Sequence, residues 1–281
     1  MDKYRIIYKI LSDNGGSKMQ YKAILLDIDG TLVVPGEPKV RPAVVQAVKR
    51  LQQQGVIIIV ATGRCEFAAA KDVLAGIRPD YGIYSNGAYV RDGKGKNLFE
   101  DRLTAQHMYT LVDFCEDFDY PLAFCYEDGY YVYIEYEKML QCYTEITGHP
   151  EHVKDGQDQD RHLQSMPYTA FAMMPPECVK QYQQKYPGLR FIPYSDGKYD
   201  VCKPTNTKAE AAKILLEKLQ LTPENLVAVG DGMNDIEMFQ LAGLSYAMGN
   251  ANETVKKTAK YVAPSVEEGG VAQVIQQIFG I

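Results

Sequence analysis

The sequence has no long apolar run, no excess of basic residues and no closely spaced pair of cysteines. Its longest strongly apolar run covers residues 56–61, whereas about 20 such residues are needed to cross a bilayer. Residues 1–16 have neither a sustained apolar stretch nor a small-residue cleavage site, which argues against a secretory signal. We therefore expect a soluble protein with no membrane partner.

Charge and cysteine usage narrow the class further. The 36 acidic residues outnumber the 30 basic ones, whereas a nucleic-acid binder normally presents a basic surface. The six cysteines lie far apart, at positions 65, 115, 125, 142, 178 and 202. In a chain of this length such spacing is typical of reduced thiols rather than of a disulfide framework or a zinc ribbon. We expect a cytoplasmic protein with no nucleic-acid partner, and no protein partner is evident.

The length of 281 residues suggests about two domains. Residues 1–18 are interpreted as an N-terminal extension, because a strong strand pattern begins only after Met19. From there short apolar strands alternate with helices, predicted at 23–26, 42–55, 56–60, 66–74 and 81–84. This alternation favours right-handed crossovers and a parallel sheet that is buried on both faces.

Residues 104–203 follow a different pattern. Thr104 is the predicted N-cap of a helix with apolar residues at helical spacing, and Asp128-Gly129 between two apolar runs predicts a hairpin. Hairpins combined with helices indicate an α+β unit whose sheet is mostly antiparallel. After residue 204 the first pattern returns.

The sequence therefore predicts an α/β fold with two domains. A Rossmann-like, parallel-sheet core domain consists of residues 19–103 and 204–281. An inserted α+β domain, residues 104–203, interrupts it.

Residues that carry chemistry gather where the predicted core strands end. The first strand is followed by Asp27-Ile28-Asp29-Gly30-Thr31 and the second by Thr62-Gly63-Arg64. The strand predicted at 226–229 is followed by the segment that contains Asp231 and Asp235, and Lys208 begins a helix. Because ligands bind outside the carboxyl ends of the strands in an open parallel sheet, we expect these groups at one edge.

The Asp-x-Asp pattern alone is a weak signal. Two further copies begin at Asp117 and Asp158, follow no apolar strand and are interpreted as solvated charges. Asp27 could also be a strand-end carboxylate that caps the next turn. The expected crowding of Asp27 with Asp231 and Asp235 favours a site, because like charges at close range need a compensating cation. Hard carboxylate oxygens with open water positions suit Mg²⁺.

A phosphate group can bind beside such a cation. A threonine hydroxyl, free backbone N–H groups and a lysine together make a phosphate cradle. A neighbouring carboxylate can act as the nucleophile of phosphoryl transfer and form an aspartyl phosphate. A second carboxylate two residues later can protonate the leaving oxygen and then activate water.

Four runs in a fixed order resemble the motifs of the haloacid dehalogenase superfamily: LLDIDGTL, ATGR, TKAEA and GDGMND. The resemblance extends from about Met19 to the C-terminus. The long insertion between the second and third motifs is similar to the type-IIB cap of the Cof-like phosphatases, and the run SNGA from Ser85 fits that subfamily. Ala209 departs from the family pattern, which usually has glycine there, but that position concerns packing rather than chemistry.

The resemblance implies a role for each site residue. Asp27 would be the nucleophile, and Asp29 would be the general acid and base and would give a backbone carbonyl to the metal ion. Thr62 and Lys208 would bind the transferring phosphoryl group and complete the catalytic set. The implied Mg²⁺ ligands are Asp27, Asp29, Asp231 and Asp235. The implied substrate- and phosphate-binding residues are Gly30, Thr62, Gly63, Arg64, Asn86, Lys208 and Asn234.

Several other residues have two interpretations. His149, His152 and His162 could form a metal cluster, but they lie in a polar segment and are interpreted as solvated. Arg64 forms a structural ion pair or reaches the substrate, and the sequence does not favour either. The tyrosines at 126–136 are explained by sheet packing, although one or two could face the substrate. Cys65 has no neighbouring histidine and is predicted to be inert.

The sequence thus predicts a Mg²⁺-dependent phosphoric monoester hydrolase that acts on a small phosphate ester, with sugar phosphates implied by the subfamily. The inserted domain would close over the substrate and set specificity. A phosphomutase or phosphotransferase shares all four motifs and differs in the acceptor hydroxyl. A non-catalytic phosphate-binding protein is disfavoured, because binding alone does not need Asp29.

Overall fold

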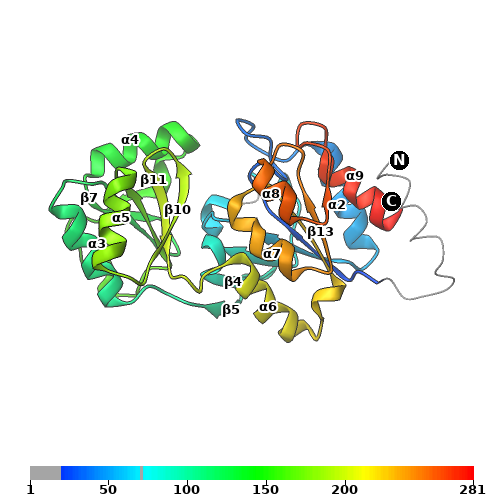
Figure 1. The fold of residues 1–281 in the computed structure, drawn as a ribbon, viewed down its shortest axis with the longest axis horizontal. Helices are drawn as coiled ribbons and strands as arrows, with labels where there is room; N and C mark the ends of the chain where they lie inside the picture. Colours follow the sequence, from blue (N-terminus) through cyan, green and yellow to red (C-terminus); the bar gives the residue numbers. More distant parts are fainter. Residues whose placement is uncertain (1–19, 70–71) are drawn as a thin grey trace.

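The computed structural model describes residues 20–69 and 72–281, so the predicted extension at 1–18 lies outside the described residues. The described chain forms two sheets, and each belongs to one of two lobes that lie side by side (Figure 1). The larger sheet has eight strands in the order β14 (Tyr261–Val262), β13 (Leu244–Ala247), β12 (Leu226–Gly230), β1 (Ala23–Leu26), β2 (Ile57–Ala61), β3 (Tyr81–Tyr84), β4 (Tyr89–Asp92) and β5 (Asn97–Glu100).

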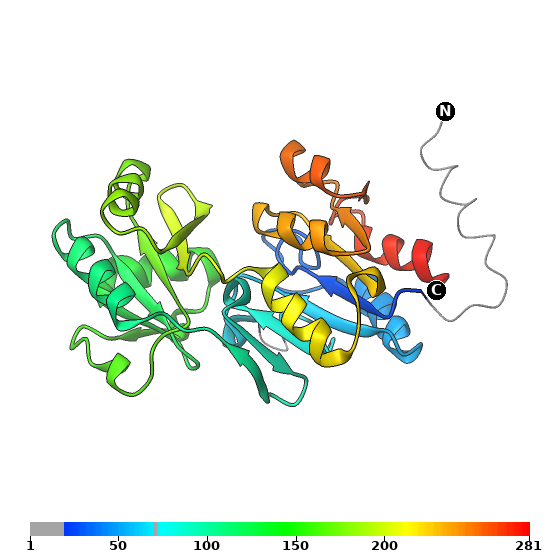
Figure 2. The same cartoon turned by 60° about the horizontal axis from the view of Figure 1, so that its bottom comes forward.

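Strand β1 lies inside this sheet and pairs in parallel with both β12 and β2. Its side chains are buried on both faces, as the apolar run predicts. Ile24 and Leu26 belong to the apolar cluster that includes residues of two helices, α2 (Pro42–Gln53) and α9 (Gly270–Phe279). Leu25 belongs to the cluster on the opposite face, with residues of α6 (Lys208–Leu219), α7 (Ile236–Leu241) and α8 (Glu253–Thr258). Helices thus cover both faces of the eight-stranded sheet (Figure 2).

The second lobe is an α+β unit, as predicted. Its six strands lie in the order β10 (Arg190–Ser195), β11 (Lys198–Cys202), β9 (Thr169–Met173), β6 (Leu122–Cys125), β7 (Tyr130–Ile134) and β8 (Val153–Asp155). The predicted hairpin is the antiparallel pair β6 and β7. One face of the sheet packs against α3 (Ala105–Glu116) and α5 (Pro176–Lys185), and the other contacts α4 (Tyr136–Thr147). The division into a core and an inserted domain at 104–203 stays a prediction.

Two local predictions differ from the structure. The predicted helix at 66–74 is a 3-10 helix at Glu66–Ala69 followed by a turn at 72–76. The carbonyl of Val73 accepts a hydrogen bond from the backbone N–H of Val40, so a tertiary contact satisfies it in place of a continued helix. Strands β4 and β5 were not predicted and extend the parallel sheet with antiparallel strands. Their signal is the turn sequence 92–95, Asp-Gly-Lys-Gly, between two short strand-like runs.

The cysteine expectation is also corrected. The structure joins Cys65 and Cys125 in a disulfide, so these two are not the reduced thiols expected from the sequence. Cys65 follows the loop after β2, whereas Cys125 ends β6, and the bond therefore links the two lobes. Sixty residues separate the pair, and its proximity depends on how the two sheets dock, which cysteine spacing cannot show. The other four cysteines are buried and free: Cys115, Cys142, Cys178 and Cys202.

None of the helices among the described residues combines the length and the apolar character that spanning a membrane would require.

Candidate active site

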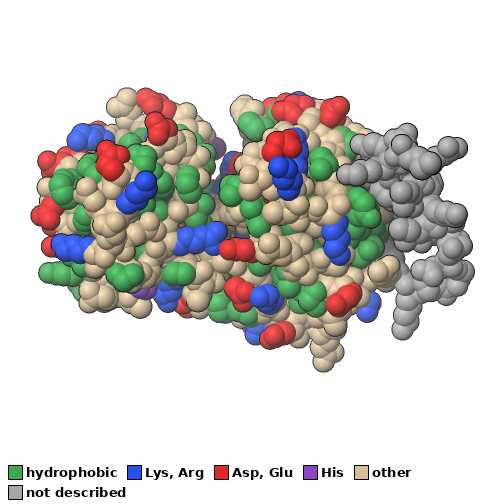
Figure 3. Space-filling view, viewed as in Figure 1, with side chains coloured by type: hydrophobic (Ala, Val, Ile, Leu, Met, Phe, Trp, Pro, Cys, Tyr) green, Lys and Arg blue, Asp and Glu red, His purple; other side chains and the backbone are tan. Residues whose placement is uncertain are grey.

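The site lies at the carboxyl edge of the parallel strands, where the surface is hollowed between the two lobes (Figure 3). Asp27 directly follows β1, and Asp231 directly follows the neighbouring strand β12. Asp235 comes one short 3-10 turn later. Carboxylate oxygens of these three residues all lie within 4.8 Å of one another, so the predicted crowding of charge is present.

Lys208 supplies a cation inside this carboxylate cluster. It is the first residue of α6, whose N-cap Thr207 accepts a hydrogen bond from the backbone N–H of Glu210. The Lys208 Nζ donates to Oδ1 of Asp27 and to Oδ1 of Asp235, both at 2.6 Å, and only 1% of the side chain is exposed. The second oxygen of Asp27, Oδ2, accepts no hydrogen bond from any residue that the structure describes, so it is open to an incoming electrophile.

Burial and crowding control the charges of the cluster. Burial raises the pKa of Asp27 well above its usual range; Lys208 opposes this shift, while Asp235 and Asp231 add to it. Burial and the neighbouring Asp235 likewise raise the pKa of Asp231 to about 6. Burial acts against the positive charge of Lys208, but Asp235 and Asp27 outweigh it and raise its pKa. One lysine therefore does not compensate the three carboxylates.

Hydrogen bonds hold the loop after β12 against the loop after β1. Asp235 Oδ2 accepts the backbone N–H groups of Asp231 and Gly232, both at 2.8 Å, so both of its oxygens are engaged. The Thr31 hydroxyl donates to Asp231 Oδ1 at 3.0 Å. Asn250, which sequence reasoning missed, donates to Asp231 Oδ2 at 3.2 Å and to the carbonyl of Gly30 at 2.8 Å. Its only sequence signal is its place just beyond β13, a neighbouring parallel strand.

Gly30 is required by geometry at this contact. It has a φ of +78°, and a Cβ at this position would overlap the carboxylate of Asp231. Gly36 has a similar φ of +85° but open space around it. We expect Gly30→Ala and Gly36→Ala each to lose about 1–2 kcal/mol of unfolding free energy from backbone strain, while only Gly30→Ala also loses activity. Denaturant titration and phosphatase assay of both variants test this, and equal activities would contradict it.

Asp29 and Arg64 form an ion pair, which was one of the two interpretations of Arg64. Arg64 Nη2 and Nε donate to Asp29 Oδ1 and Oδ2 at 2.6 and 2.8 Å, respectively. The Thr62 hydroxyl accepts the backbone N–H of Arg64 at 3.1 Å and thereby shapes the loop 62–64. The Asp29 carboxylate is thus paired with Arg64 and lies outside the cluster of Asp27, Asp231 and Asp235, with 53% of its side chain exposed.

Asn86 connects the two lobes. It is 2% exposed and has a positive φ of 55°. Its Oδ1 accepts a hydrogen bond from the side-chain amide of Asn234 at 2.8 Å. Its own amide donates to Asp200 Oδ2 on β11 at 3.1 Å. The structure thus brings the predicted residues Asn86 and Asn234 together at the edge. Sequence reasoning missed Asp200, because it lies in an unremarkable strand of the other lobe.

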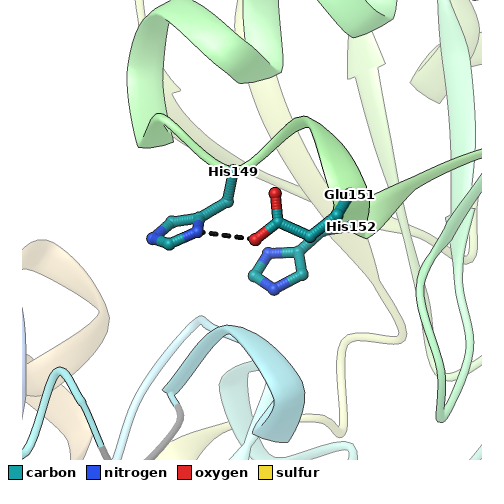
Figure 4. Close-up of side chains that lie close together, drawn as sticks. All are labelled: His149, Glu151 and His152. Atoms are coloured by element: carbon teal, nitrogen blue, oxygen red, sulfur yellow. Dashed lines mark hydrogen bonds and ion pairs between the residues drawn. The ribbon is translucent and has the colours of Figure 1, made fainter.

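The histidines form no convincing metal site. His149 lies 2.8 Å from Glu151, and with His152 they make a cluster at the start of a short 3-10 turn (Figure 4). The two imidazole rings stack at 5.2 Å with only 22° between their planes. Ring nitrogens direct their lone pairs in the ring plane, so nearly parallel rings do not aim them at one point. His162 lies apart, 3.3 Å from the Tyr133 hydroxyl.

The carboxylate cluster, in contrast, fits a hard divalent cation. Its donors are the oxygens of Asp27, Asp231 and Asp235, and the negative charge exceeds that of Lys208. Burial and mutual repulsion raise the pKa of Asp27 and of Asp231. A divalent cation would remove this repulsion, and an oxygen-only set suits Mg²⁺.

Comparison with known proteins identifies the class. The sequence model of the haloacid dehalogenase-like hydrolases matches residues 24–275, so the chain belongs to this family. It is 27% identical to the 5-amino-6-(5-phospho-D-ribitylamino)uracil phosphatase YcsE of Bacillus subtilis, over 91% of this chain and 94% of that protein. It is 29% identical to a Haemophilus influenzae protein named provisionally as a phosphatase, over 94% of this chain and 98% of that one.

Two other relatives are longer. The chain spans 57% of a Streptococcus pyogenes protein named provisionally as a bifunctional phosphatase and peptidyl-prolyl cis-trans isomerase, with 24% identity. It spans 46% of the chloroplastic endoribonuclease YBEY of Arabidopsis thaliana, with 23% identity.

Solved structures show the same fold. The phosphatase BT1666 of Bacteroides thetaiotaomicron superposes with a TM-score of 0.85 at 24% identity, covering 96% of this chain and 99% of that one. The subclass IIB sugar phosphatase BT4131 gives a TM-score of 0.80 at 24% identity, over 92% and 99% of the two chains. The α/β fold with a parallel-strand core sheet and a second sheet is thus that of the subclass IIB enzymes.

Proposed function

We propose that this enzyme is a Mg²⁺-dependent phosphatase that hydrolyses small phosphomonoesters, sugar phosphates above all, through an aspartyl phosphate at Asp27. The observation that carries the proposal is the open Oδ2 of Asp27. Its partner oxygen is held by the buried Lys208, so the carboxylate is fixed at the strand end while Oδ2 keeps no hydrogen bond among the described residues.

The residues around Asp27 divide the work of the reaction. Lys208 holds the nucleophile and presents positive charge to the transferring phosphoryl group. Thr62 and Gly63 begin the loop after β2, the strand next to β1 and Asp27. Asn86 and Asn234 orient each other beside this loop. Asp29 stands two residues from the nucleophile on an exposed turn, where its carboxyl can exchange protons with the leaving oxygen and then with water. Arg64 orients that carboxyl.

Asp27, Asp231 and Asp235 would hold the metal ion, with the backbone carbonyl of Asp29 as the further ligand that the family resemblance implies. When bound, Mg²⁺ supplies positive charge to the phosphoryl oxygens and lowers the repulsion between phosphate and carboxylates.

Metal removal provides a test of this assignment. We expect exhaustive EDTA treatment to abolish hydrolysis of p-nitrophenyl phosphate and Mg²⁺ to restore it, because the three carboxylates otherwise repel the phosphate. Mg²⁺ should also raise the melting temperature of the wild type, and Asp231→Asn should reduce that rise. Full turnover after chelation, or an equal rise in the variant, would contradict the metal site.

We further propose that residues 104–203 form a cap domain that governs substrate choice. The proposal is supported by the hydrogen bond from Asn86, at the catalytic edge, to Asp200 on β11 of the six-stranded sheet. A substrate held at Asp27 would therefore present its leaving group to this lobe.

A further inference from the structure

Asp200 is the carboxylate that the six-stranded sheet adds to the catalytic edge. On β11 its neighbours Tyr199 and Val201 belong to the apolar cluster with α3 and α5, so Asp200 points to the opposite face of the strand. There its Oδ2 accepts the Asn86 amide at 3.1 Å, and a Cβ on Gly63 would stand 3.1 Å from the same oxygen. The carboxylate therefore borders the loop 62–64 beside Asp27.

The hydrogen bond to Asn86 engages one oxygen of the Asp200 carboxylate. Its Oδ1 accepts no hydrogen bond, and neither oxygen forms an ion pair, among the residues that the structure describes. Burial raises the pKa of Asp200 to about 6; the Asn86 hydrogen bond opposes this shift and the charge of Asp29 adds to it. A half-buried carboxylate without a direct ion-pair partner costs stability, and such costs persist mostly where function needs the group.

An aromatic side chain lies on the same face. Tyr194 on β10 is 58% exposed, and its ring packs edge-on against Phe171 of β9. Burial raises the pKa of the Tyr194 hydroxyl, and the charges of Asp29 and Asp200 raise it further while Arg64 lowers it. Phe171 is the register partner of Asp200 on β9, so the Tyr194 ring and Asp200 share one face of the sheet. An exposed ring beside an acceptor-only carboxylate suits a molecule with an apolar face and several hydroxyl donors.

We propose that Asp200 is a specificity-determining residue that accepts a hydrogen bond from a hydroxyl of the leaving alcohol, and so selects polyhydroxylated phosphate monoesters. This inference rests on the phosphatase function proposed above. The same carboxylate repels a leaving group that carries its own negative charge, so neutral polyol monophosphates are preferred over bisphosphates and carboxylated esters.

Two esters of equal chain length test the inference: sorbitol 6-phosphate and n-hexyl phosphate, which lacks the hydroxyls. In Asp200→Ala we expect kcat/KM for sorbitol 6-phosphate to fall roughly 10- to 100-fold, the effect of one hydrogen bond to a charged group. The fall for n-hexyl phosphate should be much smaller, because this ester has no hydroxyl to bond to Asp200 and is affected only through Asn86. Asp196→Ala, at an exposed position between β10 and β11, is the matched control and should leave both esters unaffected.

The alternative is that Asp200 only positions Asn86. Asp200→Asn separates the two roles, because its amide oxygen still accepts from Asn86 but no longer offers a charged acceptor to the substrate. A selective loss for sorbitol 6-phosphate in both variants supports the inference. An equal loss for both esters, or no loss for either, overturns it while leaving the phosphatase function in place. If the wild type hydrolyses p-nitrophenyl phosphate but neither of these esters, the inference is overturned; if it hydrolyses none of the three, the proposed function fails as well.

Discussion

Asp27→Asn is expected to lower hydrolysis of p-nitrophenyl phosphate by at least about 10⁴-fold, because an amide cannot replace the attacking carboxylate. The substitution keeps the shape of the side chain and an oxygen that can accept from Lys208, so the fold should be retained. Burial raises the pKa of Asp27 well above its usual range, and a neutral side chain is therefore tolerated at this position. Steady-state assays and thermal melts of the purified variant measure both effects.

The other Asp-x-Asp copies provide a matched control. Asp158 is exposed and lies in no helix or strand, so Asp158→Asn should keep full activity. A fully active Asp27→Asn protein would show that another residue is the nucleophile.

Lys208→Met is expected to lose about 3–5 kcal/mol of unfolding free energy at pH 8, in addition to activity. The lysine is the cation bonded to Asp27 and Asp235, which are 6% and 0% exposed. Its removal leaves two buried carboxylates without their partner. Because the raised pKa of Asp27 rises further without the lysine, the folded variant binds more protons than the unfolded chain. Its stability therefore falls as the pH rises from the pKa of Asp27 in the unfolded chain to the raised pKa of Asp27 in the folded variant, and it recovers at lower pH.

Lys213→Met is the control on the same helix. Lys213 is half exposed and, within the part of the chain that the structure describes, pairs only with Glu210 on the surface, where an ion pair contributes little. Urea titrations of both variants at pH 5.5 and pH 8 measure the difference. An equal loss in the two variants, or a Lys208→Met loss that does not depend on pH, would contradict the charge balance described for the cluster.

The residues at the strand ends could be predicted because local pattern determines them. Apolar runs mark β1 and β12 as buried parallel strands, and topology then places Asp27 and Asp231 at one edge. Lys208 could be placed because it begins a helix that returns to the same sheet. The family motifs added the roles, which no pattern of polarity could supply.

Contacts between the two lobes could not be predicted in this way. The bond from Asn86 to Asp200 joins residues 114 positions apart, and the disulfide joins Cys65 to Cys125 across the same boundary. Both depend on how the two sheets dock, and neither leaves a periodic signal. The hairpin of β4 and β5 is different, because its turn sequence was visible and only the preference for a purely parallel sheet hid it.

For Asp29 and Arg64 the sequence predicted that the residues lie close together but not which group the Arg64 side chain binds. The two residues follow adjacent parallel strands, so their proximity was expected. Whether the guanidinium binds a neighbour or a substrate depends on side-chain direction, which the order of residues does not encode.

The most direct test of the account is the intact mass of Asp29→Asn protein, quenched in acid after mixing with p-nitrophenyl phosphate and Mg²⁺. Nitrophenolate leaves with little protonation, so attack by Asp27 should proceed, whereas hydrolysis of the intermediate lacks its base. We expect the mass of one added phosphoryl group, located on Asp27 by peptide mapping, and no added mass on Asp27→Asn. A phosphorylated Asp27→Asn protein, or phosphate located on another residue, would contradict the central claim.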